Sequence, residues 1–161
     1  MEIRKGMGKG VGNFGIDLKN SEAAVKLVEE RLHEIWTRGP FPLVFEDNHD
    51  YRWDFIARTA DKKHHIKVEV KNDTIFDTSG NLAIEVECRG VSSGLSVSLA
   101  SVYAFVTEHK IFFCYSNDLK KMIADEPRLN FKYIGDDNAS KCYLICERYL
   151  IEHVKTNIIF A

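Results

Sequence analysis

Three residues near the middle of the chain have the types and spacing for chemistry at a phosphate: Asp54, Glu69 and Lys71. Glu69 and Lys71 lie in a run of Val and Ile typical of a strand, where residues two apart point to the same face. The apolar residues around Asp54 predict a neighbouring strand joined to it by a polar turn, so its carboxylate can reach the same place. Val68 and Val70 then face the opposite way, into a core. Two acids and an amine on one face exceed what a fold needs.

These residues suit a hard divalent cation, which prefers one or two carboxylates completed by water and substrate phosphate. Asp54 and Glu69 supply carboxylates, and the backbone carbonyl of Val70 can add a third ligand. We therefore expect a Mg²⁺ site in which Mn²⁺ can substitute. Lys71 would orient a water molecule or neutralise charge that develops on the phosphate. The alternative is an exposed row of charges, because surface pairs such as Glu69 and Lys71 are common and contribute little.

Composition places the chain among ordinary globular proteins. It has 161 residues, of which 45% are hydrophobic and 29% charged, with a net charge of -2. This length can bury a substantial core in one domain. The charge gives no overall basic field, although nucleic-acid binding needs only a local basic patch. No apolar run of about 18 residues and no apolar signal segment occurs, so we expect a cytoplasmic protein with no membrane partner.

Hydrophobic periodicity predicts helices and strands in alternation. A glycine-rich, flexible arm over residues 1–17 precedes a helix over residues 21–37, which is capped by Asn20 or Ser21 and stopped by Gly39-Pro40. The strands that carry Asp54 and Glu69 follow, with residues 42–45 as a strand or linker. The remaining predicted elements are a strand at 81–88, a short helix at 93–101, a hairpin of 103–107 and 111–115, a helix from 117 to Pro127, strands at 131–134 and 142–145, and a turn of helix or strand at 149–153. This order predicts a mixed α/β (α+β) domain over residues 18–161, with a central mixed sheet flanked by helices.

The order of elements, together with Asp54, fourteen intervening residues and then Glu69-Val70-Lys71, resembles the PD-(D/E)XK nuclease superfamily. The core of that superfamily is a helix, a three-stranded meander, a helix and a further strand. The segments TSGNLAIEVE and GVSSGLSVSLASVYAFV resemble the third strand and second helix of phage-encoded members, and GDDNASKCYLI resembles a later loop and strand. The resemblance covers residues 18–146. Trp53 stands where the superfamily name expects a proline.

The resemblance implies a restriction-endonuclease-like core and a phage-encoded, metal-dependent endonuclease that cuts DNA. Asp54 then matches the metal-binding aspartate, Glu69 the second acid and Lys71 the lysine. Glu22 matches a helix-borne glutamate directed at the metal or its water, and Glu29, two turns on, is an alternative.

Two acids, Glu22 and Glu85, have more than one interpretation. Glu22 equally suits the positive end of a helix dipole. Glu85 could complete a two-metal site or hydrogen-bond the lysine, or it could form a surface carboxylate row with Glu87 on the same face.

Contacts to DNA are expected from two segments. Ser93, Ser96 and Ser98 lie near the start of the predicted second helix, where hydroxyl groups and free amides can bind phosphate. Asn138, Ser140 and Lys141 offer the same groups from the GDDNASK loop. The sequence shows no aromatic platform spaced for unpaired bases.

A core of this size leaves no room for a separate recognition domain, so we expect a homodimer, with residues 111–115 as the candidate interface. The alternative function is a non-catalytic nucleic-acid-binding or interaction module on the same fold.

Overall fold

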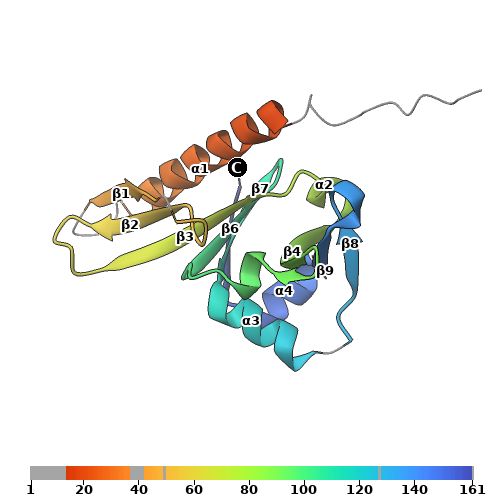
Figure 1. Cartoon of the computed structure of the whole chain (residues 1–161). Coiled ribbons are helices and arrows are strands. Elements are labelled where there is room, and N and C mark those ends of the chain that lie inside the picture. Colours follow the sequence, from red (N-terminus) through yellow and green to blue (C-terminus); the bar gives the residue numbers. More distant parts are fainter. Residues whose placement is uncertain (1–13, 37–41, 49, 127, 161) are drawn as a thin grey trace, which may run out of the picture.

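The structure is a computed structural model that describes residues 14–36, 42–48, 50–126 and 128–160. It confirms the mixed α+β class, with a central mixed sheet, a second sheet and four flanking α-helices in the described part (Figure 1). The helices are α1 (Phe14–Trp36), α2 (Phe76–Ser79), α3 (Ser116–Asp125) and α4 (Glu147–His153), with short 3-10 turns η1 (Gly94–Ser96) and η2 (Asp136–Asn138). No helix in the described ranges is long and apolar enough to cross a membrane.

The central sheet has six strands in the order β1-β2-β3-β6-β7-β10. They are β1 (Leu43–Asp47), β2 (Phe55–Thr59), β3 (His65–Asn72), β6 (Val102–Val106), β7 (Lys110–Tyr115) and β10 (Thr156–Phe160). β1, β2 and β3 form an antiparallel meander, whereas β3 and β6 run parallel. A parallel pair needs a crossover connection. Here α2, β4 (Asn81–Cys88), β5 (Val91–Ser92) and η1 form that crossover.

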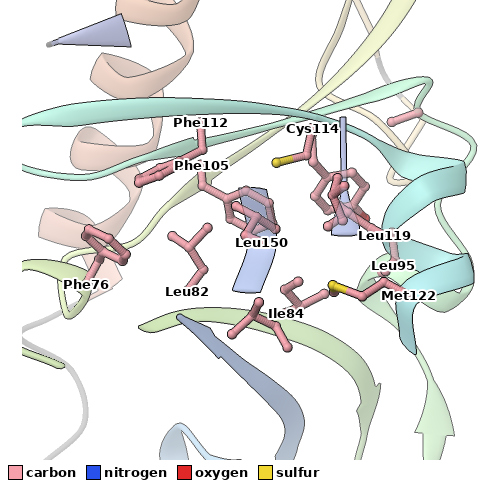
Figure 2. Close-up of a cluster of buried hydrophobic side chains, with 14 residues drawn as sticks. Phe76, Leu82, Ile84, Leu95, Phe105, Phe112, Cys114, Leu119, Met122 and Leu150 are labelled. Carbon is pink, nitrogen blue, oxygen red and sulfur yellow. The ribbon is translucent and has the colours of Figure 1, made fainter. Parts of the chain in front are cut away.

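The second sheet is antiparallel and has the order β5-β4-β9-β8, with β8 (Phe131–Ile134) and β9 (Ser140–Cys146). Between the two sheets lies an apolar core in which side chains from β4, β6 and β7 meet those of α3 and α4; Figure 2 shows Leu82, Phe105, Phe112, Leu119 and Leu150 converging there. A second core lies on the other face of the central sheet, under α1. The central sheet is therefore covered on both faces.

Several predicted elements are confirmed. The hairpin of β6 and β7, the helix α3 and the strands β8 and β9 occur where they were predicted, and α4 settles the last segment as helix. The predicted helix is also present, but α1 begins at Phe14, so Asn20, Ser21 and Glu22 lie inside it rather than at its start. Cap residues are favoured at helix starts without being excluded from interiors. The last four residues of the predicted arm are thus helical, and residues 1–13 lie outside the described part.

Two predictions about the middle of the chain are wrong. The strand at 81–88 exists as β4, but it belongs to the second sheet, and β1 supplies the third strand of the meander. Alternation identifies a strand without identifying its neighbour. The predicted helix at 93–101 is only the three-residue turn η1. Its serines and glycine are poor helix formers, and Gly94 has the positive φ of 50° that a helix interior excludes.

The prediction that residues 111–115 form an exposed edge and a dimer interface is also wrong. β7 lies between β6 and β10, and Ile111, Phe112, Phe113 and Cys114 are buried. A strand with partners on both sides has no free backbone groups to offer a second chain.

Candidate active site

The strand β3 presents Glu69 and Lys71 on the face away from α1. Val68 and Val70 point into the core under α1, as their alternation predicted. The Lys71 Nζ lies 2.5 Å from the Glu69 Oε1, and the side chain of Lys71 is 42% exposed against 10% for that of Glu69. Glu69 is therefore a buried carboxylate with one cationic partner, which rules out the interpretation as a fully solvated charge row.

Asp54 lies immediately before β2 and is locked onto β3 by two hydrogen bonds. Its backbone N–H donates to the carbonyl of Val68 at 2.8 Å, and its Oδ2 accepts the N–H of Val70 at 2.6 Å. The N–H and C=O of one strand residue point toward the same neighbour. The Val70 carbonyl therefore also points to the side of Asp54, beyond the last β2 pair, which joins Phe55 to Val68. The three predicted metal ligands thus lie at one place on the sheet.

Two acids, Asp54 and Glu69, share a single cationic partner, Lys71, at this place. Burial raises the pKa of Glu69; Lys71 acts against that rise, and the negative charge of Asp54 adds to it. The charge of Asp54 is thus near enough to disfavour the ionisation of Glu69. A cation held between the two carboxylates would offset both the cost of burying the charge of Glu69 and its repulsion by Asp54.

Two adjoining hollows open beside Glu69 and Lys71, between the two sheets. One has a volume of about 290 Å³ and is lined by Glu69, Lys71 and Glu85 together with residues of the 51–52 and 92–98 segments. The other, of about 230 Å³, shares Lys71 and Glu85 and extends to Tyr103. We call the two together the inter-sheet cleft. It gives a ligand access to the charged face of β3.

β4 carries Glu85 into this cleft and is irregular just beyond it. Glu85 pairs with Cys142 and Glu87 with Lys141, so the register shifts by one residue between the two acids. Cys142 and Lys141 are neighbours that point to opposite faces, and their partners do the same. Glu85 and Glu87 therefore do not form the row on one face that was offered as an alternative.

The neighbouring turn fixes the position of Glu85. The hydroxyl of Ser93 donates to its Oε1 at 2.8 Å. Gly94 follows with φ 50°, and a Cβ at that position would collide with the backbone oxygen of Glu85. Glycine is thus needed for η1 to approach β4 this closely.

Glu22 and Glu29 are not brought to the cleft. Both belong to α1, which packs on the opposite face of the sheet through Ala24 and Val28, and neither lines the cleft. Glu22 is exposed. Burial raises the pKa of Glu29, and the charge of Asp47 at the end of β1 raises it further, so Glu29 faces β1 rather than Asp54.

The structure places the three serines that were predicted to bind DNA in different surroundings. Ser93 lines the cleft and holds Glu85, and Ser96 is exposed on η1. Ser98 is 3% exposed; its hydroxyl donates to the carbonyl of Arg52 at 2.9 Å and accepts the N–H of Ala100 at 3.1 Å. Ser98 therefore ties two segments together.

The second predicted DNA-binding segment lies away from the cleft. Asn138 is exposed in η2, and Ser140 and Lys141 begin β9. None of the three lines the cleft. The Lys141 Nζ lies 4.4 Å from the ring centroid of Phe131.

Several cleft residues were not singled out from the sequence, among them two tyrosines and an arginine. Tyr51 and Arg52 line the larger hollow, and Tyr103, which pairs with Glu69 across the parallel strands, lines the smaller one. Burial raises the pKa of Tyr103, and the charges of Glu69, Asp54 and Glu85 raise it further, so it stays a neutral donor. Its only signal in the sequence was its place in a strand, which does not reveal a parallel neighbour.

No group of three or more His, Cys, Asp or Glu side chains in the described ranges is arranged to hold a metal ion. Asp54 and Glu69 are a two-carboxylate set, which is the number that Mg²⁺ commonly takes from a protein. Comparisons with protein-family models, curated proteins and solved structures found no match to this chain. We therefore infer the function from the geometry of the cleft.

Proposed function

We propose that this protein is a Mg²⁺-dependent DNA endonuclease that hydrolyses phosphodiester bonds in the inter-sheet cleft. The observation that carries the proposal is the buried carboxylate of Glu69, set between Asp54 and Lys71 in the wall of a hollow open to solvent. A protein gains no stability by burying an acid against another acid. Such arrangements are concentrated at functional sites.

The residues at the site fit Mg²⁺. One oxygen of Asp54 is bound to the Val70 N–H, and no other hydrogen bond to this carboxylate occurs in the described part of the chain. Its second oxygen, the carboxylate of Glu69 and the Val70 carbonyl would hold the ion, with water and phosphate completing the shell. When bound, Mg²⁺ supplies Lewis-acid polarisation of the phosphate and lowers the pKa of bound water.

Lys71 would bind the reacting phosphate. Its side chain is partly exposed, so its ammonium can turn from Glu69 to a phosphate oxygen without leaving the cleft. A cation placed there offsets the negative charge that develops in the transition state. Glu85 lines both parts of the cleft beside Lys71, where it would help to orient the ammonium.

The topology agrees with the resemblance in part. A helix, a three-stranded antiparallel meander and a further strand parallel to β3 occur in the implied order. The implied second helix is replaced by the crossover through α2, β4, β5 and η1. A fold-level likeness alone does not carry a function, so this agreement supports the proposal without deciding it.

A non-catalytic nucleic-acid-binding module is the second candidate. It is favoured by the lack of a three-ligand group in the described residues and by the ion pair that already occupies Glu69. The two candidates differ in their response to metal. Mg²⁺ that binds only the folded enzyme would raise its Tm with concentration, whereas the binding module would show no rise.

A cleavage assay tests the proposal. Wild type, Lys71→Ala and the control Lys121→Ala, whose exposed lysine lies on α3 away from the cleft, would be incubated with plasmid, linear duplex, single strand, four-way junction and RNA in Mg²⁺, Mn²⁺ or EDTA. We expect metal-dependent cutting of DNA by wild type and the control, and a loss of about 10²–10³-fold in Lys71→Ala. Cutting that survives in EDTA, or that Lys71→Ala performs like wild type, would overturn the proposal.

Three further proposals accompany this function: a phage origin, a cytoplasmic location and a homodimer. The interior position of β7 leaves β1 and β10 as the edges of the central sheet that a second copy could extend. Sedimentation of the purified chain with and without DNA would give the oligomeric state. A monomer in both conditions would remove the homodimer from the proposal.

A further inference from the structure

An aromatic and basic loop borders the cleft beside Glu69 and Lys71. Tyr51 is 85% exposed, and Tyr51 and Arg52 both line the larger hollow. The next residue, Trp53, packs against the core between the sheets. The exposed ring of Tyr51 contributes little to the fold, yet it stands at the entrance to the proposed active site.

Hydrogen bonds connect the described residues on either side of Tyr51. The side-chain amide of Asn48 donates to the carbonyls of Asp50 and Trp53 at 2.7 and 2.8 Å. The Asp50 carboxylate accepts the Arg52 backbone N–H at 3.0 Å and its Nε at 2.8 Å. The Arg52 carbonyl accepts the hydroxyl of Ser98. A ring whose neighbours are held by hydrogen bonds loses less conformational entropy when a ligand binds to it.

Two cations accompany the rings. The Arg52 guanidinium lies 5.9 Å from the ring centroid of Tyr51 and 5.7 Å from that of Trp53. The Lys67 Nζ lies 4.0 Å from the Trp53 centroid. Lys67 is two residues before Glu69 on β3, so it shares the face of Glu69 and Lys71. Whereas Asp50 pairs with Arg52, no carboxylate of the described residues forms an ion pair with Lys67.

We propose that Tyr51, Arg52 and Lys67 form a subsite for the nucleotide next to the cleaved bond, in which an unpaired base stacks on Tyr51. This inference rests on the proposed function and names its substrate class as single-stranded nucleic acid or an unpaired segment of it. Bases stack on aromatic side chains when their faces are free, and cations that follow the backbone bind the phosphates. In an intact duplex the faces of the bases are covered by their neighbours, so Tyr51 would contribute nothing to its binding.

Binding in EDTA tests the subsite without requiring cleavage. Fluorescence anisotropy would compare a labelled single strand of DNA with the duplex of the same sequence, for wild type, Tyr51→Ala, Tyr51→Phe and Tyr133→Ala. Tyr133, on β8 and 51% exposed, is a matched control outside the cleft. We expect Tyr51→Ala to weaken single-strand binding about tenfold. Tyr51→Phe and Tyr133→Ala should bind like wild type, and duplex binding should be weaker than single-strand binding and unaffected by any variant.

The results separate this inference from the proposed function. Equal loss of single-strand and duplex binding in Tyr51→Ala, no loss at all, or tighter binding of the duplex by wild type would overturn the subsite. Metal-dependent cutting together with any of those results would leave the nuclease proposal standing. Binding that depends on Tyr51, in a protein that cuts no member of the cleavage panel, would support the subsite and overturn the nuclease.

Discussion

The two faces of β3 are built from the same strand and do opposite things. On the α1 face, Val68 is fully buried and Val70 is 8% exposed, and both pack against Ala24 and Val28. On the cleft face, Glu69 is 7% exposed and is thus about as buried as Val70. Its side chain is an acid, however, and burial raises the pKa of that acid. Burial stabilises the first face and costs stability on the second. The comparison indicates that the cleft face is kept for something other than stability.

The largest expected effect belongs to the α1 face. Phe55, in β2 beside Val68, is 1% exposed, so Phe55→Ala removes a ring from a packed core and should lower the free energy of unfolding by about 3–5 kcal/mol. Urea denaturation would measure it. Phe160→Ala, at a position that is 77% exposed, is the control and should change stability by less than about 0.5 kcal/mol. Similar losses in the two variants would show that the α1 face is not the packed core described here.

The sequence predicted the local parts of this comparison well. The alternation of Val68, Glu69, Val70 and Lys71 fixed the two faces of β3, since the period of a strand is a local property. The hairpin of β6 and β7 and the helix α3 were equally local. The neighbours of β3 were harder: β6 is parallel to it and lies across a crossover of about thirty residues. Strand propensity carries no information about a partner so distant.

The site was predicted in its centre and missed at its border. Asp54, Glu69 and Lys71 come from adjacent strands, and the structure brings them together. Glu85 was named as a possible member of the site and lines both parts of the cleft, but alternation could not reveal the register shift that takes Glu87 off its face. Tyr51 stands in a loop whose shape depends on hydrogen bonds to Asn48, Asp50 and Ser98, so no regular aromatic spacing marked it.

A smaller effect would sharpen the comparison at the border of the cleft face. Gly90 and Gly94 both have positive φ, of 77° and 50°, but only at Gly94 would a Cβ collide with β4. Gly90→Ala should lower the free energy of unfolding by about 1–2 kcal/mol, because alanine is strained in this backbone conformation. Gly94→Ala should cost more and should also displace Glu85, which Ser93 holds beside it. Equal unfolding free energies for the two variants would show that η1 does not press on β4.

The smallest effect has the opposite sign, and it tests whether the charge on the cleft face costs stability. The raised pKa of Glu69 means that the folded protein favours the protonated form of this side chain. The stability that the protonated Glu69 contributes is therefore fully present below the ordinary pKa of 4.5 and is lost as the pH rises through the raised pKa. Glu69→Gln imitates the protonated form at every pH. The variant should therefore have a higher Tm than wild type at pH 7, and the difference should vanish as the pH falls below 4.5. Differential scanning calorimetry at both pH values would measure it. A lower Tm at pH 7 would mean that the ion pair with Lys71 outweighs burial, and that both faces of β3 are built for stability.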